Sequence, residues 1–436
     1  MSDRSAESAG PALKQGVGLI DLVMLGAGTA IGAAVFSVLG PAAQVGGNGI
    51  LIAVGLAALP MVVFGLVYAY MASALPRTAA SFEWQRQFTH PLIAFAVVWM
   101  RILANAVLMI VLAKVLVNYL GKVLPLPAKP VMLGFYLVIF ALNYVGVAVA
   151  ARVQTALMLL LLIVFAVFVA SGLPSLKPGL FVAAIHDGWS PIILVLPLMI
   201  QLFLGIETAT EVGEEVADAR RVVPWGIALA LLLTVVVYGA IAFTALSLEG
   251  APGLAHSKAP LLAAAQVSLG PWATPLIVTA AVLALTKSMN AVFLVFSRFL
   301  YAMGKAGVLP SPLAHIHPRF GTPDVATMAA LGLTVLGLFL PDSLLFLLLA
   351  INIPTMMKYF GTSLAAFNVA TRHPDVHAQA RLGFGKRTVM TLALLGMAAA
   401  VIIAVVGFST DWRPYALLAG WLAVGLGYYG VRALRK

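Results

Sequence analysis

The sequence of 436 residues contains no cysteine and few charged residues. Without cysteine, disulfide bonds and cysteine-based metal or redox sites are excluded. Charged residues make up 9% of the chain, whereas soluble domains carry about 25%. Hydrophobic residues make up 62%, the mean hydropathy is +1.05, and apolar runs long enough to cross a bilayer recur along the chain. The sequence therefore predicts an all-α integral membrane protein.

Several function classes lack their sequence motifs. There is no Walker A pattern, so ATP-driven transport within this chain is not expected, and no motif for Ser/His/Asp catalysis suggests an enzyme. His315 and His317 have no acidic or cysteine companion at ligand spacing, so we expect them to fold a loop rather than bind a metal. Residues 1–14 are polar and no cleavable signal peptide is evident. We expect no bound cofactor.

The net charge of +11 is distributed in a way that argues against nucleic-acid binding. Basic residues gather in alternate short loops, as the positive-inside rule requires of a membrane protein. The loops on the other side have only Lys122, Lys129, Lys177, Lys258 and Arg413. Both termini, residues 1–16 and 433–436, are therefore predicted to be cytoplasmic tails of a multi-pass protein in the cytoplasmic membrane.

Twelve membrane helices are predicted, each near the roughly 20 residues that a bilayer requires. Their expected ranges are 17–39, 50–73, 91–120, 130–149, 152–172, 190–214, 224–247, 272–302, 323–340, 343–370, 387–408 and 413–432. Residues 76–91 are too polar to span and are expected to lie along one membrane face.

Three glycines, Gly26, Gly28 and Gly32, stand inside the first predicted helix, in the stretch GAGTAIGAAVF. Glycine costs roughly 1 kcal/mol against alanine inside a helix. In lipid, an opened backbone is tolerated only where it lines a cavity or is buried in protein. The stretch therefore fits a broken helix with a polar socket, but Gly28-xxx-Gly32 also fits a close helix-packing motif.

The sixth predicted helix has a similar polar, glycine-containing centre, GIETATEVGEE. It lies five helices after the first, and broken helices at corresponding places in two halves are typical of inverted-repeat transporters with a site at the midplane. This favours the broken-helix interpretation. The repeats would be residues 17–172 and 190–370, with the two helices in 387–432 outside them.

Motifs along the chain resemble those of amino acid–polyamine–organocation superfamily permeases. The first helix has Gly28-xx-Ile31-Gly32-xx-Val35-Phe36, similar to GxxIGxGIF, and the sixth has Phe203-Leu-Gly-Ile-Glu207, similar to FxGFE. The eighth helix and its loop run from Asn290 to Pro323 and resemble the family pattern NAxLxxxSRxLYAM…LP…HPRFGTP. The resemblance covers roughly residues 15 to 330.

This resemblance implies the LeuT-like fold and transport of an amino acid or related amine by alternating access. The N-terminus of the second half of a broken helix is a ready site for a substrate carboxylate. We expect the carboxylate to lie against the backbone of residues in the first helix, with a wall from the sixth helix and a polar contact from the third. The expected substrate-binding residues are Ala27, Gly28, Thr29, Gly32, Ala33, Asn105, Phe203 and Gly205. For Asn105, a helix-packing hydrogen bond is an equal alternative.

Ionisable and polar groups inside the membrane are candidates for coupling and gating. Glu207 is the acidic candidate for a proton or gating role, and Gln201 and Arg101 are further candidates. Proton-coupled members of the family often carry a lysine in the fifth helix, which this chain lacks, whereas Lys287 stands in the eighth. Our hypothesis is that Lys287 replaces the sodium ion that LeuT-like transporters hold between helices 8 and 1. Transport would then be sodium-independent, by proton symport or by exchange (antiport).

Other interpretations remain open. Lys287 would alternatively form a static ion pair or extend towards the interface. Lys114 and Lys358 add further intramembrane cations, which fits an acidic amino acid or organic anion as substrate unless Arg101 pairs with Glu83 or a helix 6 glutamate. Glu211, Glu214 and Glu215 beside Arg220 and Arg221 suggest an interfacial salt-bridge cluster. A channel or receptor on the same scaffold is a different class.

Overall fold

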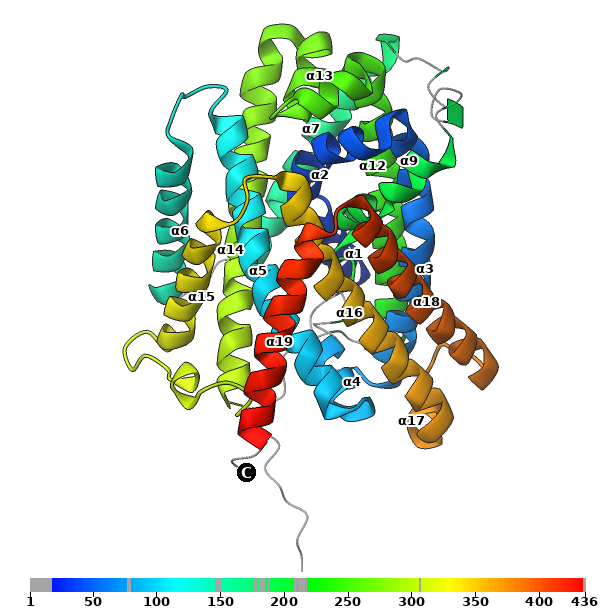
Figure 1. The fold of residues 1–436 in the computed structure, drawn as a ribbon. Helices are drawn as coiled ribbons and strands as arrows, with labels where there is room; N and C mark the ends of the chain where they lie inside the picture. Colours follow the sequence, from blue (N-terminus) through cyan, green and yellow to red (C-terminus); the bar gives the residue numbers. More distant parts are fainter. Residues whose placement is uncertain are drawn as a thin grey trace, which may run out of the picture.

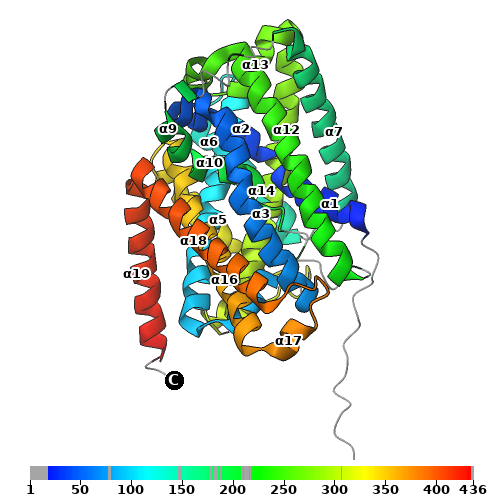
Figure 2. The same ribbon diagram turned by 90° about the vertical axis from the view of Figure 1, so that its right-hand side faces the viewer.

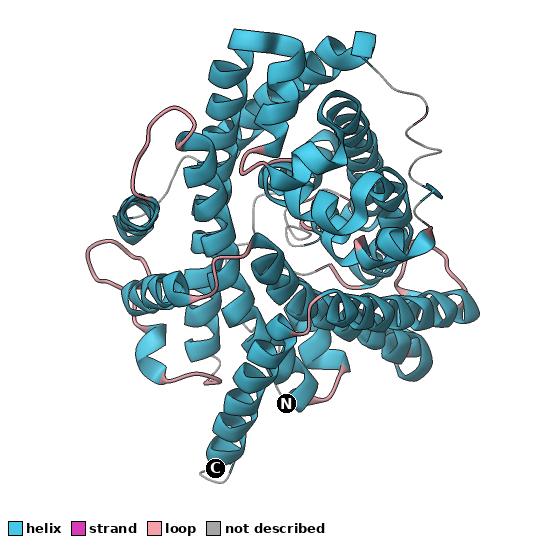
Figure 3. Cartoon of the chain, turned by 45° about the horizontal axis from the view of Figure 1, so that its top comes forward, coloured by secondary structure: helices cyan, strands magenta, loops and turns pink. Residues whose placement is uncertain are grey.

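The structure is a computed structural model that describes residues 18–76, 80–145, 150–175, 179, 185–186, 188–207, 210, 216, 218–305 and 307–433. Within these residues, the side chains at 25, 29, 80, 145, 150–156, 219–220 and 433 lie outside the description. Every regular element drawn in the described part is a helix (Figure 3). The all-α prediction is therefore confirmed for these residues.

The long helices stand side by side, with short ones at their ends (Figure 1). The α-helices are α1 (Leu19–Ala30), α2 (Ala33–Gly46), α3 (Ile50–Ala74), α4 (Ala80–Phe88), α5 (Pro91–Leu120), α6 (Ala128–Val145), α7 (Ala150–Gly172), α9 (Trp189–Leu194), α10 (Leu196–Met199), α12 (Ala219–His256), α13 (Pro260–Leu269), α14 (Ala273–Lys305), α15 (Asp324–Leu336), α16 (Leu344–Arg372), α17 (Pro374–Ala378), α18 (Lys386–Thr410) and α19 (Arg413–Ala433). Short 3₁₀ helices are η1 (Gly47–Gly49), η2 (Leu173–Ser175), η3 (Ile200–Phe203), η5 (Gly270–Trp272), η6 (Ser311–Ala314) and η7 (Gly337–Phe339).

Seven helical stretches in the described part are long and apolar enough to cross a membrane, by length and composition. Some join two elements; Ala33–Ala74, for example, contains α2 and α3. Shorter apolar helices occupy Leu19–Gly28, Ala128–Tyr144, Trp189–Phe203 and Asp324–Phe339. The protein is thus an integral membrane protein by composition, and the expected number of twelve helices stays a prediction.

The predicted helix ranges agree with the observed elements to within a few residues at most ends. The range 91–120 coincides with α5, which begins at Pro91, where the missing proline N–H costs no hydrogen bond, and stops before Gly121. The polar stretch 76–91 contains the short helix α4. In the range 190–214, helix continues to Phe203 and a turn follows at residues 204–207, while residues 208–209 and 211–215 lie outside the described part.

The break between α1 and α2 is buried, whereas the first residues of α1 are exposed. The half-helix α2 packs against α12, α13, α5 and α14, while α1 packs against α12 and α7. Helices α19 and α7 stand on opposite outer sides (Figure 2). The broken first helix is therefore enclosed by the other long helices, which is where an opened backbone is tolerated in a membrane.

Candidate functional site

The first membrane helix is broken between α1 and α2, as predicted. Helix α1 ends at Ala30, Ile31 is extended with φ −80° and ψ 104°, and α2 starts at Ala33. The break leaves backbone groups without helical partners, and a tyrosine of α12 meets them. The Tyr238 hydroxyl donates to the Ala30 carbonyl oxygen at 2.6 Å and accepts from the Gly32 N–H at 3.3 Å. One buried side chain thus joins both sides of the opening.

The sixth helix is also broken. Helices α9, α10 and η3 follow one another to Phe203, after which Leu204 is extended and Gly205 has a φ of +109°. Glycine adopts this conformation without the steric cost that a Cβ would add. A single turn follows at residues 204–207, and Thr210 is the next described residue. The opening at Gly205 is the break that was expected in the sixth helix.

Helix α1 lies against the break of the sixth helix at Gly26. A Cβ on Gly26 would come within 3.0 Å of the Ile206 carbonyl oxygen and 3.2 Å of the Ala230 side chain. Close packing therefore explains this glycine. At Gly28 and Gly32 an added Cβ would meet its nearest neighbours at 3.7 and 3.8 Å, which is ordinary contact. The packing motif suggested for Gly28 and Gly32 therefore has no close contact at either glycine, and the close contact lies at Gly26 instead.

A cavity of about 260 Å³ lies where the two breaks meet α5, α14 and α16. Its walls are mostly apolar, and its polar side chains are Ser37, Gln201, Lys287 and Ser288. The lining residues are Gly28, Ala30, Ala33, Ala34, Ser37, Val38, Leu108, Val111, Leu112, Gln201, Leu204, Gly205, Lys287, Ser288, Ala291, Val292, Leu348 and Ile351. Such a cavity, apolar with a few convergent polar groups, is typical of a small-molecule site.

Lys287 is the cation among the described residues that line this cavity. Its Nζ donates to the Gly28 carbonyl oxygen, 3.3 Å away, and so connects α14 to the end of α1. None of the ion pairs between described residues includes Lys287. This positive charge is therefore paired, within the described part, with a backbone dipole and not with a carboxylate.

The expected substrate-binding residues divide into two groups. Gly28, Ala33 and Gly205 line the cavity, as do the coupling candidates Gln201 and Lys287. The others lie outside the lining, or have side chains outside the description: Ala27, Thr29, Gly32, Asn105, Phe203, Glu207 and Arg101. Phe203 is fully buried, and Asn105 has a buried Nδ2 without a hydrogen-bond partner in the described structure.

Sequence reasoning placed Lys287 of α14 at the site but missed the other lining residues of α5, α14 and α16. On α5 the lining residues are Leu108, Val111 and Leu112, at helical spacings of three and four. The same spacing relates Ser288 to Ala291 and Val292 on α14. These residues belong to helices that are apolar over most of their surface. The sequence pattern alone therefore does not distinguish residues that line a cavity from residues that face lipid.

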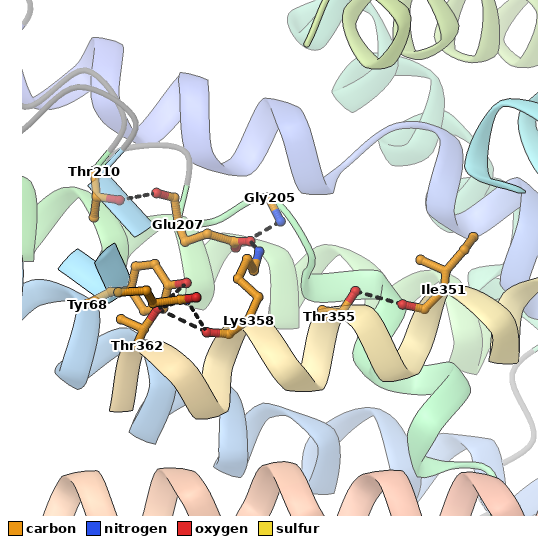
Figure 4. A network of polar contacts seen from close by, with 9 residues as sticks. Tyr68, Gly205, Glu207, Thr210, Ile351, Thr355, Lys358 and Thr362 are labelled. Atoms are coloured by element: carbon orange, nitrogen blue, oxygen red, sulfur yellow. Dashed lines mark hydrogen bonds and ion pairs between the residues drawn. The ribbon is translucent and has the colours of Figure 1, made fainter. Parts of the chain in front are cut away.

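An ion pair joins the break of helix 6 to the middle of α16 (Figure 4). Glu207 Oε1 bonds Lys358 Nζ, and Glu207 Oε2 accepts from the Gly205 N–H at 3.0 Å. The two charged side chains are only 11% and 13% exposed. The network continues through the Lys358 carbonyl oxygen, which accepts from the Thr362 hydroxyl at 3.0 Å. Both residues were singled out from the sequence, but their pairing was not.

The remaining intramembrane cations have partners that change the sequence-based interpretation. Arg101 lies over the Phe299 ring, 5.2 Å from its centre, while Glu83 pairs with Arg86 and Glu207 with Lys358. The suggested pairing of Arg101 with Glu83 is therefore wrong, since Glu83 and Arg86 are neighbours on α4. Lys114 pairs with Asp342, which is exposed. Glu211, Glu214 and Glu215, the suggested interfacial cluster, lie outside the described residues.

The histidines of the loop before α15 contact residues of the loop and of the start of α15. His315 Nδ1 lies 2.7 Å from Asp324 Oδ1, an acidic partner beyond the spacing considered in the sequence. The His317 ring stacks on Phe320, and the Thr322 hydroxyl donates to the Tyr144 carbonyl oxygen at 2.6 Å. These contacts attach the loop to the end of α6.

The tyrosine at the first break gives a direct prediction. Tyr238→Phe removes the hydroxyl and leaves the buried Ala30 C=O and Gly32 N–H without this partner, so we expect a loss of about 1 to 3 kcal/mol of stability. Thermal unfolding of the purified protein measures it. The matched control is Tyr136→Phe, because Tyr136 is equally buried but makes one long bond of 3.5 Å. Equal unfolding temperatures for the two variants would contradict the bridging role.

Comparison with known proteins identifies the family. The family model described as amino acid permease matches residues 17–424. An uncharacterized transporter of Mycobacterium tuberculosis is 27% identical over 426 residues, covering 97% of this chain and 92% of that protein. Two proteins of Bacillus subtilis also match over 98% of this chain. The branched-chain amino acid permease BcaP is 26% identical over 94% of its length, and the methylthioribose transporter is 24% identical over 95%.

The family predicted from the motifs is confirmed by these matches. They extend beyond the part of the chain in which the motifs were found, up to residue 424. The relatives are named as transporters and permeases. The chain belongs to the amino acid permease family, within the amino acid–polyamine–organocation superfamily, and is a membrane transporter.

Proposed function

We propose that the protein is a secondary active transporter that moves an amino acid or related amine across the cytoplasmic membrane by alternating access. The observation that carries this proposal is the cavity of about 260 Å³ at the two helix breaks. Residues 17–172 and 190–370 would form the inverted repeats, and both termini would be cytoplasmic. Binding between the discontinuous helices of two repeats is the general design of such transporters.

The substrate favoured by the cavity has a carboxylate and a small apolar side chain. Ala33 and Ala34 line the cavity in the first turn of α2, where free N–H groups and the helix dipole attract an anion. Leu108, Val111 and Ile351 offer apolar contact to a side chain. The relative named as a branched-chain amino acid permease supports this class.

An acidic substrate or organic anion remains the second candidate because Lys287 lines the cavity. Fewer intramembrane cations support an anionic substrate in the structure than in the sequence. Lys114 and Lys358 pair with carboxylates, and Arg101 lies over an aromatic ring. The second candidate therefore rests on Lys287.

Coupling is proposed to be sodium-independent. The Lys287 ammonium lies on α14 beside the Gly28 carbonyl oxygen, which supports a fixed cation in the place of a bound sodium ion. A positive charge carried by the protein needs no sodium gradient, so protons or a counter-substrate would drive the cycle.

Transport by purified protein in proteoliposomes tests the proposal. We expect saturable uptake of a neutral branched amino acid in sodium-free buffer, with stimulation by the same amino acid inside the vesicles. A channel gives no such trans-stimulation, and uptake of glutamate in preference would favour the second candidate.

A cavity-filling variant connects the activity to the site. Ala291→Phe is expected to abolish uptake because the ring occupies the cavity that Ala291 lines. The matched control is Leu142→Phe, a substitution at an exposed position on the outer helix α6. Normal uptake by Ala291→Phe would show that this cavity does not hold the substrate.

A further inference from the structure

A second cavity, of about 210 Å³, lies on the opposite side of α5 from the proposed substrate cavity and has several charged side chains in its lining. Lys114 of α5, Lys129 of α6 and Lys258 between α12 and α13 line it together with one carboxylate, Asp342. Residues 110, 114 and 117 of α5 line this cavity, whereas residues 108, 111 and 112 line the other, so the two cavities use different faces of one helix.

The charge of this cavity is not balanced by the described residues. Asp342 pairs with Lys114, and its own side chain is 97% exposed. Lys129 and Lys258 are exposed and take part in none of the ion pairs between described residues. Two positive charges therefore remain without a countercharge from the described part of the chain.

A random distribution of the few basic residues on this side would not be expected to bring two lysines to one cavity. The loops on this side have few basic residues, and two of those few, Lys129 and Lys258, line the same cavity. They come from separate connections of the chain, so sequence neighbourhood does not bring them together. A shared anionic ligand gives a physical reason for the arrangement.

Apart from Asn118, the rest of the lining is apolar and borders the lipid-facing side. Ile110, Met132 and Leu338 contribute to it. Helix α6 stands at one edge of the molecule beside α15 (Figure 1), and it exposes apolar side chains such as Leu137 and Val138. A ligand that fits must carry a negative group at the lysines and an apolar part beside α6.

We propose that this cavity binds the headgroup of an anionic phospholipid, with the phosphate at Lys129 and Lys258. The glycerol and the start of the acyl chains lie against the apolar residues between α5 and α6. A free phosphate has the same charge but makes no use of this apolar surface. The site is separate from the substrate cavity and does not depend on what the protein transports.

The experiment compares the full-length protein in detergent micelles with increasing phosphatidylglycerol or phosphatidylcholine, at one ionic strength. We expect phosphatidylglycerol to raise the unfolding temperature saturably and phosphatidylcholine to have little effect. In Lys129→Gln/Lys258→Gln, half-maximal stabilisation is expected at a roughly 30-fold higher lipid fraction, from about 1 kcal/mol per lysine.

The control Lys122→Gln/Lys386→Gln removes two exposed lysines that lie outside the cavity lining. This variant is expected to respond to phosphatidylglycerol as the wild type does. An equal loss of response in both double variants would overturn the proposal, since it would mean a general charge effect. Saturable stabilisation by inorganic phosphate alone, at the same concentrations, would overturn the assignment to a lipid.

Discussion

Replacing Lys358 by methionine is expected to lower the free energy of unfolding by about 3 to 5 kcal/mol, because the substitution leaves Glu207 as a buried charge without its partner. Both side chains lie almost completely out of solvent, so water cannot solvate the carboxylate that remains. The Gly205 N–H still donates to Glu207, but one neutral donor does not replace an ammonium group. Thermal or denaturant unfolding in detergent measures the loss.

A double variant separates the missing charge from lost packing. Glu207→Gln/Lys358→Met removes both charges and is expected to recover most of the stability, since replacing a buried pair by groups of similar volume is often neutral. The control Lys114→Met breaks the pair with the exposed Asp342 and is expected to cost within about 1 kcal/mol. A Lys358→Met variant as stable as the Lys114→Met control would refute the buried-pair interpretation.

The same pair shows where sequence-based prediction ends. Glu207 and Lys358 were each identified as costly intramembrane charges, which is a property of one residue and its neighbours. Their pairing spans 151 residues and depends on how the break of helix 6 meets α16. No spacing of neighbouring residues in the sequence predicts this contact between Glu207 and Lys358. For Arg101, the same lack of a local signal led to Glu83 as a suggested partner, which is wrong, while the alternative partners Glu211, Glu214 and Glu215 lie outside the described residues.

Helix positions were predictable because they depend on local composition. The apolar run that begins at Pro91 and ends before Gly121 gives the bounds of α5 directly. A break in the sixth helix was expected, but its position at Gly205 was not, because it depends on the backbone angle of one glycine. The cavity was predictable at the breaks, where glycine is unusual. It was not predictable at Leu108 or Ile351, which are apolar residues in apolar helices.

Substitution of Lys287 is expected to separate stability from transport. Lys287→Met should leave the unfolding temperature unchanged or raise it, because in the described structure the Lys287 ammonium bonds only a backbone carbonyl and its burial costs free energy. Uptake driven by a pH gradient is expected to fall tenfold or more, an effect of about 1.4 kcal/mol or more, since methionine cannot take up and release the proton that the proposed coupling requires. This opposite response distinguishes Lys287 from Lys358, whose loss should damage the fold first.

Three measurements in proteoliposomes decide the role of Lys287: uptake with and without a pH gradient, uptake with sodium added, and exchange between equal substrate pools. Lys305→Met is the matched control, since Lys305 is an exposed lysine at the end of the same helix. If the ammonium replaces a sodium ion, the wild type and the control ignore sodium and respond to the gradient, while Lys287→Met does not respond to the gradient. Sodium-dependent uptake by the wild type, or a normal gradient response in Lys287→Met, would refute this role. A purely structural lysine would instead lower the unfolding temperature, uptake and exchange together, because its loss would disturb the contact between α14 and the end of α1 on which the cavity depends.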